Sequence, residues 1–163
     1  MKIRTDFVTN SSSSSFVVAF NNKEEGIEYF AKKAELDDRI SRVLSDFLRK
    51  EPLSKEKLHR IVSDEANSDA CSRLCYSFRA NFREEWLKKN PGGSYFEMFE
   101  SQEYKDASKS LIEDFIKRFY EELGDKAYVV IMEYGDESGG IFGELEHYVM
   151  PALDCVVRRF NHH

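Results

Sequence analysis

The sequence contains little glycine, proline or cysteine, and it has no long hydrophobic run. Eight glycines and three prolines in 163 residues are too few for a collagen-like chain or for a disordered chain rich in these residues. No stretch approaches the ~20 consecutive apolar residues that a membrane-spanning helix needs. Three cysteines are an odd number and do not indicate a disulfide framework, so we expect free thiols. The chain is predicted to be neither a fibre nor a membrane protein.

The residues that are present suit one folded domain. Hydrophobic residues make up 41% of the chain and charged residues 33%. A chain of this size buries enough surface to fold without a metal or a disulfide. Charges at Lys2, Arg4 and Asp6 interrupt the apolar segment that a secretory signal would need. We therefore expect a single domain over residues 1–163, located in the cytoplasm, with no cofactor.

The charge of the chain is acidic and uneven. The net charge is -6, and residues 127–163 contain six acidic residues against two basic ones. Such a segment repels a phosphate backbone, so nucleic-acid binding is disfavoured. We expect the partner to be a protein, and we do not expect the chain to bind a membrane.

Both ends of the chain read as β-structure. Two β-prone runs, residues 3–8 and 16–20, flank a run of serines that we interpret as a loop. Residues 127–134 form a nearly continuous apolar run, which predicts a buried strand at the centre of a sheet. A short helix over 141–150 and a last strand near 155–160 follow, and this order favours parallel pairing of the two strands.

The middle of the chain reads as helical. Asn22 and Glu25 form a predicted capping box, and further helices are expected after Asp37, Ser54 and Ser68. A long helix is expected over residues 102–123. The predicted fold class is α+β, with a small mixed sheet of about four strands from both chain ends, 1–20 and 127–163. A central all-helical insertion of about five helices, residues 22–124, lies between them.

The opening MKIRTDFVTNSSSSSF resembles the start of a family of bacterial and phage proteins that begin with a basic strand, a Thr-Asn or Ser-Asn step and a serine run ending in Phe. The segment ELEHYVMPALDCVVRRFNHH is similar to the tail of one subset of that family. The resemblance implies a prokaryotic or phage origin and a cytoplasmic setting. It implies no activity and no site residues.

The serine run is the candidate ligand-binding segment. Its members are Ser11, Ser12, Ser13, Ser14 and Ser15. Successive backbone N–H groups and hydroxyls in a loop can form a concave site for phosphate, with Lys2 and Arg4 nearby. The alternatives are a flexible connector whose serines face water, which is the commoner outcome, and a run that is phosphorylated.

The C-terminal segment carries candidate chemical groups. Acid–base catalysis would draw on Asp136, Glu144, Glu146 and His147, and a metal would draw on His147, His162 and His163. The spacing matches no HExxH motif, and solvated carboxylates are the commoner outcome. Cys71 and Cys75 lie on one apolar helical stripe and are expected to pack in a core. We therefore expect neither a bound metal nor a catalytic site. The alternative is that the acidic residues and histidines named above form one.

Aromatic residues make up 13% of the chain. Tyr95, Phe96, Met98 and Phe99 follow a Pro-Gly-Gly break, and they would form a partner-binding patch if exposed or ordinary core if buried. Trp86 is expected to be buried beside Phe78 and Phe82.

The expected function is that of a non-enzymatic accessory or regulatory protein that binds another protein or macromolecule. A phage or mobile element is a source of the protein that is compatible with this interpretation. The alternative is a small enzyme or ligand-binding protein that uses the serine loop and the C-terminal acidic and histidine residues for phosphate or metal-dependent chemistry.

Overall fold

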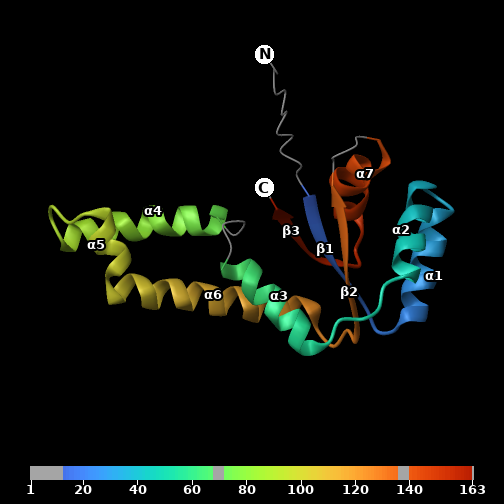
Figure 1. Ribbon diagram of the computed structural model, residues 1–163, viewed down its shortest axis with the longest axis horizontal. Helices are drawn as coiled ribbons and strands as arrows, with labels where there is room; N and C mark the ends of the chain where they lie inside the picture. The colour runs from blue at the N-terminus through green and yellow to red at the C-terminus, as the bar shows by residue number, and fades with distance from the viewer. Residues whose placement is uncertain (1–12, 68–71, 136–139, 163) are drawn as a thin grey trace, which may run out of the picture. The chain divides into compact units, whose positions relative to one another are not determined.

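The computed structural model describes residues 13–67, 72–135 and 140–162, which form a mixed α and β structure (Figure 1). By its internal contacts the chain divides into two compact units. We call residues 54–124 the helical unit, and the described residues before and after them the sheet unit.

The sheet unit is built from both ends of the described chain. Its elements are β1 (Ser13–Phe20), α1 (Lys23–Ala34), α2 (Arg39–Leu48), β2 (Tyr128–Gly135), α7 (Ile141–Glu144), the π-helix η2 (Leu145–Val149), the 3-10 helix η3 (Met150–Ala152) and β3 (Val156–His162). The predicted capping of α1 is confirmed, because the Asn22 side chain accepts from the Glu25 N–H at 2.9 Å. The helix predicted over 141–150 is present as the consecutive turns α7, η2 and η3.

The sheet of the described residues has three strands in the order β2-β1-β3, and both pairings are antiparallel. The expected mixed sheet of four strands is therefore corrected. The strand predicted over residues 3–8 lies outside the described residues. β2 and β3 run in the same direction, but β1 lies between them and bonds to both, so the expected parallel pair does not form.

The position of β2 also differs from the prediction. Its apolar run indicated a central strand, whereas in the sheet of the described residues β1 is central and β2 lies at an edge. Most of β2 is buried, but Glu133 is exposed. A continuous apolar run reports that both faces of a strand are covered, and it carries no information about how many neighbours the strand has.

One face of the sheet forms the main core with α1, α2 and η2. The side chains of Phe16, Val18 and Phe20 on β1 share this face with alternate residues of β2, as the two-residue period of a strand requires. Gly26 of α1 is needed here, because a Cβ at that position would lie 2.3 Å from the Phe47 ring. The close approach of α1 to α2 therefore depends on a missing side chain.

The described residues of the helical unit form four helices. They are α3 (Lys55–Asn67), α4 (Ser72–Lys89), α5 (Tyr95–Glu100) and α6 (Gln102–Leu123). The aromatic segment after the Pro-Gly-Gly break, which had no assigned structure, is the helix α5, held by a capping box between Ser94 and Glu97. Gly124 ends α6 with φ 59°, as a C-terminal glycine can.

The division into units falls inside the predicted helical part, residues 22–124. α1 and α2 group with the sheet unit, and α3 to α6 form the helical unit. Whether both units unfold together as one domain stays a prediction. None of the described helices has the length and apolar character required to cross a bilayer.

Candidate functional site

Two groups of side chains in the structure could carry function. The first lies in the sheet unit, where the candidate acid Glu146 meets the serine run. The second lies in the helical unit, around the aromatic segment of α5.

In the sheet unit, three elements bring Ser14, Glu146 and Arg159 together. The Ser14 hydroxyl of β1 donates to Glu146 Oε1 of η2 at 2.6 Å. Arg159 of β3 donates to Ser14 Oγ through Nε at 3.1 Å and through Nη2 at 2.9 Å. Its Nη2 also lies 3.3 Å from Glu146 Oε1. We call this set the Ser-Glu-Arg cluster.

The Glu146 carboxylate in this cluster is fully buried. Arg159 compensates its charge, and the guanidinium lies 5.5 Å from the centre of the Phe16 ring. Glu146 Oε2 has no hydrogen-bond partner among the described residues, and the Nε2 atom of the half-exposed His147 is 3.9 Å from it. The cluster therefore ties η2 to two strands and leaves one buried acceptor atom unused.

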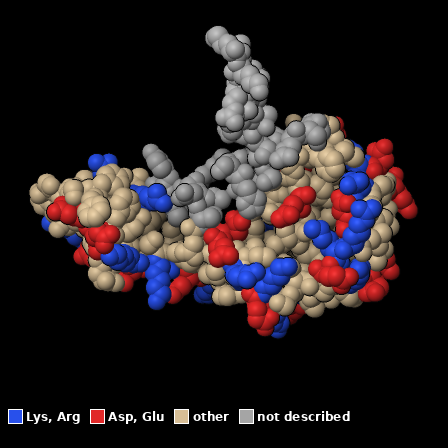
Figure 2. Space-filling model, viewed as in Figure 1, with Lys and Arg blue, Asp and Glu red and all other residues tan. Residues whose placement is uncertain are grey.

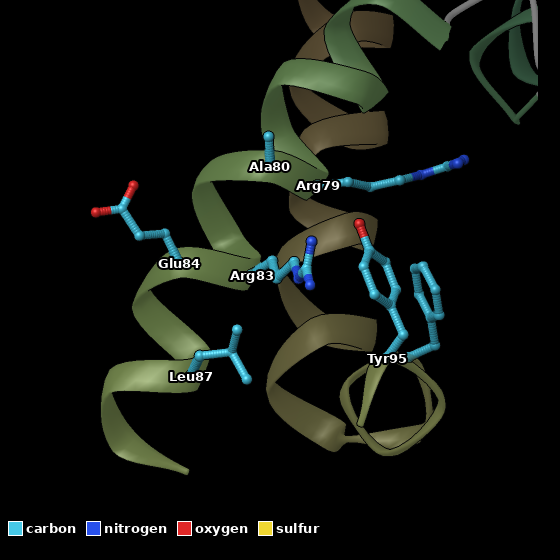
Figure 3. Close-up of a pocket in the computed structure, with 7 residues that line it drawn as sticks. Arg79, Ala80, Arg83, Glu84, Leu87 and Tyr95 are labelled. Carbon is cyan, nitrogen blue, oxygen red and sulfur yellow. The ribbon is translucent and has the colours of Figure 1, made fainter. Parts of the chain in front are cut away.

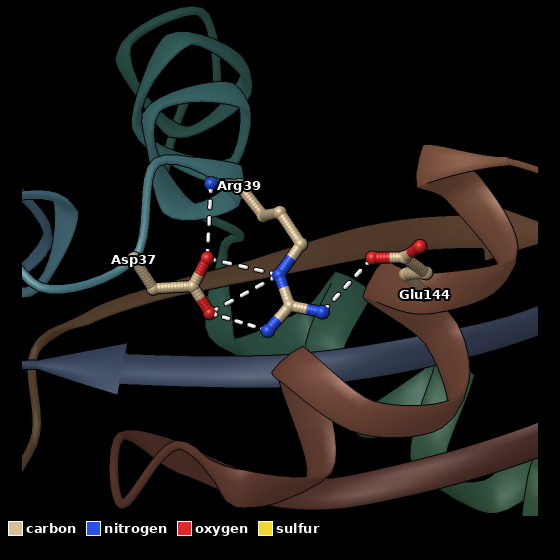
Figure 4. Close-up of polar contacts among 3 residues, drawn as sticks. All are labelled: Asp37, Arg39 and Glu144. Carbon is tan, nitrogen blue, oxygen red and sulfur yellow. Dashed lines mark hydrogen bonds and ion pairs between the residues drawn. The ribbon is translucent and has the colours of Figure 1, made fainter.

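Glu144 does not join this cluster. Its Oε2 atom accepts from Arg39 Nη1 at 2.9 Å, and Arg39 Nη2 is 2.7 Å from Asp37 Oδ2 (Figure 4). The hydrogen bonds from Arg39 lower the pKa of the Asp37 carboxyl. Half of the Glu144 side chain is exposed, so water screens this ion pair. Glu144 therefore links the start of α2 to α7 at the surface.

The other candidate residues have separate positions. Ser11, Ser12, Asp136 and His163 lie outside the described residues. Ser13 and His162 are cross-strand partners at the end of the sheet. Ser15 is buried, and its hydroxyl lies 3.5 Å from Glu133 Oε1.

These positions change the interpretation of the serine run. Ser13, Ser14 and Ser15 belong to β1, so the loop predicted for them is wrong, and Ser14 and Ser15 do not face water. The hydroxyls reach carboxylates of η2 and β2 because successive strand residues point to opposite faces. An anion bound at Ser14 would lie beside the Glu146 carboxylate, which has the same sign of charge. That the serine run is a ligand site stays a prediction.

The metal-ligating and thiol groups of the described residues lie apart from one another or are buried. It contains no group of three or more His, Cys, Asp or Glu side chains that could hold a metal ion. Cys155 is buried, and burial raises the pKa of its thiol to about 12. The thiol is therefore protonated at neutral pH and a poor nucleophile. Cys71 and the side chain of Cys75 lie outside the described part.

In the helical unit, α4 and α5 form a cleft with a volume of about 450 Å³ (Figure 3). We call it the α4–α5 cleft, and its lining residues are Arg79, Ala80, Arg83, Glu84, Leu87, Tyr95 and Phe99. The Arg83 guanidinium lies 4.5 Å from the centre of the Tyr95 ring. Neither Arg79 nor Arg83 has a carboxylate within 4.0 Å among the described residues. The cleft thus combines an aromatic wall with two cations available for an anionic group.

The aromatic segment of α5 is split between core and surface. Met98 is fully buried, whereas Phe96 is 75% exposed and Tyr95 is 46% exposed. The two interpretations of the sequence, patch or core, therefore each apply to part of the segment. Trp86 is buried as predicted, and its ring packs so closely on Gly93 that a Cβ there would lie 2.3 Å from Trp86 Cζ3.

The sequence analysis missed the arginines of both groups. Arg79 and Arg83 are four residues apart on α4 and so share a helical face, which is a signal that the sequence does contain. Arg159 has a weaker signal. Arg159 lies beside Phe16 because of the register between β1 and β3, which the sequence alone does not show.

No family model, no curated protein and no solved structure matches this chain.

Proposed function

We propose that this protein is a non-enzymatic accessory or regulatory protein that binds another protein, and that its contact surface is the α4–α5 cleft with Phe96. The observation that carries the proposal is the 75% exposure of the Phe96 side chain. A large aromatic side chain held in water by a capped helix has an unfavourable contact with solvent that a partner would remove. Aromatic residues and arginine are the residue types that most often dominate binding energy at protein interfaces.

The charges of the cleft support a partner of defined chemistry. Arg79 and Arg83 can each pair with a carboxylate, and the stacking of Arg83 on Tyr95 holds one guanidinium in place. A partner that covers Phe96 with an apolar side chain and directs an acidic side chain into the cleft would use both features. A protein partner also fits the surface better than nucleic acid does, because basic and acidic side chains are interspersed on the face shown in Figure 2.

Site-specific photocrosslinking tests this proposal. Phe96 is replaced by p-benzoylphenylalanine in cells that express the chain, and the matched control carries the same replacement at Leu36, which is 84% exposed in the sheet unit. We expect a cross-linked partner of discrete mass at position 96 and none at position 36. The adduct should disappear when Arg79→Glu and Arg83→Glu are added, because the reversed charges repel the partner's carboxylates.

Two results would overturn the proposal. One is the absence of a partner adduct at position 96. The other is the same set of adducts at both positions, because random collisions would then explain them. Melting curves of Phe96→Ser should match those of the parent chain within about 0.5 kcal/mol, which separates loss of binding from loss of folding.

The Ser-Glu-Arg cluster favours a second candidate function. The buried and unpartnered Glu146 Oε2 atom could accept a hydrogen bond from a small ligand, as a ligand-binding protein or small enzyme would require. Calorimetric titration with metabolite mixtures, compared between the parent chain and Glu146→Gln, tests it. Heat of binding that is identical in both proteins, or absent from both, would count against this second function.

A further inference from the structure

Within the described ranges, the outer edge of β2 carries backbone hydrogen-bonding groups that point away from β1. The Ala19 N–H of β1 donates to the Cys155 carbonyl at 3.1 Å and so points away from β2. Its cross-strand partner Val129 accepts at its carbonyl from the Leu53 N–H at 2.8 Å, outside the sheet. Because directions alternate along an antiparallel strand, Ile131 and Glu133 also face outward. In the described part of the chain, no backbone group from outside the sheet bonds to either residue.

A groove is lined by residues of β2, of α2 and the segment after it, and of α7. Within the sheet unit, α2 lies beside β2 (Figure 1). The volume of the groove is about 440 Å³, within the range of ligand sites. The lining residues are Arg42, Asp46, Arg49 and Lys50 from α2 and the segment after it, Met132, Glu133 and Tyr134 from β2, and Phe142 from α7. A helix and an exposed strand edge thus enclose a space in which an extended chain can lie.

The charges of the groove determine what fits. Asp46 is already matched by Arg42, whose Nε lies 3.3 Å from Asp46 Oδ2. The Arg42 guanidinium also lies 5.4 Å from the centre of the Phe142 ring. Arg49 and Lys50 have no carboxylate partner for their side chains among the described residues. The two unmatched cations favour carboxylates, while the partly buried Phe142 provides apolar surface.

We propose that the groove between α2 and β2 binds an extended acidic segment of another protein by strand addition. The segment pairs with the backbone of Ile131 and Glu133, and its acidic side chains pair with Arg49 and Lys50. This site is separate from the α4–α5 cleft, so it goes beyond the function proposed above. Backbone pairing with β2 provides affinity that does not depend on the sequence of the bound segment. Arg49 and Lys50 provide the preference for acidic residues.

The test uses a fluorescent peptide of 8 residues, the length of β2, with alternating Glu and Val. The control peptide alternates Lys and Val. Fluorescence anisotropy with the full chain should give saturable binding of the Glu peptide that is at least about tenfold tighter than that of the Lys peptide. In NMR spectra, the amide protons of Ile131 and Glu133 should exchange more slowly when the peptide is bound, because each gains a hydrogen bond.

Two pairs of variants assign the site. Glu133→Pro removes an outward N–H, which an edge strand tolerates, and Glu133→Ala removes only the side chain. We expect the proline variant to lose binding and the alanine variant to keep it. Arg49→Glu with Lys50→Glu should weaken binding about tenfold or more, whereas Lys109→Glu with Lys117→Glu on α6 makes the same charge change and should not. The charge pair remains decisive if the proline variant fails to fold.

Several results would overturn the proposal. They are an absence of saturable binding, equal binding of both peptides, binding without slower exchange at Ile131 and Glu133, and tighter binding of a single-stranded oligonucleotide of the same length. Dimerisation of the chain through the edge of β2 would also overturn it, because a second copy would then be the occupant.

Discussion

The sheet unit and the helical unit bury their aromatic side chains to different depths. In the sheet unit, the ring of Phe47 lies 5.6 Å from Phe20, 5.1 Å from Phe30 and 5.6 Å from Tyr128, centre to centre. These rings belong to one core cluster. In the helical unit, Tyr104 contacts three rings in the same way, but all four side chains are only partly buried.

The difference follows from the architecture of the units. A sheet covered by helices encloses a core between two layers, whereas helices that pack only on one another without such a layer leave part of each apolar face in water. The sheet unit therefore has the structure of a stable frame. The helical unit has exposed apolar and cationic groups that a partner can contact.

The largest effect is expected in the sheet unit. Phe47→Ala should lower the free energy of unfolding by about 3–5 kcal/mol, because it removes a fully buried ring from the centre of the core. Leu48→Ala, next on the same helix but 47% exposed, is the control and should change it by less than about 1 kcal/mol. Urea unfolding followed by circular dichroism measures both. Similar losses for the two variants would contradict the proposed core.

Trp86→Ala tests the helical unit in the same way. The loss should be about 3 kcal/mol, at the lower end of the range for aromatic truncation, because the ring is 8% exposed. Phe96→Ala should leave stability within about 0.5 kcal/mol. If Phe96→Ala proved as destabilising as Trp86→Ala, Phe96 would be a core residue and the contact surface proposed for it would fail.

The Ser-Glu-Arg cluster should matter more than the surface ion pair of Glu144. Arg159→Met leaves the buried Glu146 carboxylate uncompensated, and we expect a loss of about 2 kcal/mol, discounted because the Arg159 side chain is 29% exposed. Arg39→Met breaks an exposed pair that water screens and should cost less stability than Arg159→Met. Adding Glu146→Met to Arg159→Met should recover stability. Equal losses of stability for Arg159→Met and Arg39→Met would contradict the expectation that the buried pair contributes more than the exposed pair.

The smallest effect concerns acid pH. Hydrogen bonds from Arg39 lower the pKa of Asp37 in the folded protein, so Asp37 stabilises the fold above its unfolded pKa of about 3.9. This stabilisation is lost as the pH falls through the lower folded pKa. Melting temperatures of the parent chain and of Asp37→Asn should therefore converge as the pH falls below about 3.9. A gap that stays constant from neutral to acid pH would exclude this carboxylate as the cause.

Features set by neighbouring residues could be predicted from the sequence. The start of α1 at Asn22 and the end of α6 at Gly124 depend on a few adjacent residues, and both are confirmed. The order of the strands could not be predicted, because it depends on which distant segments pair. The same limit applies to the site. Glu146 was a candidate acid, but its contact with Ser14 joins residues 132 positions apart, and the contact of Arg159 depends on strand register.

Residue-resolved hydrogen exchange of the intact protein tests most directly whether the sheet unit opens less readily than the helical unit. We predict that the amides through which β1 and β2 pair exchange only by global unfolding, whereas amides of α4 and α5 around the cleft exchange through smaller local openings. Within β2, Val130 and Met132 should be protected and Ile131 and Glu133 should exchange faster. Protection in α5 equal to that in β1 would contradict the account, because the helical unit would then be as rigid as the sheet unit.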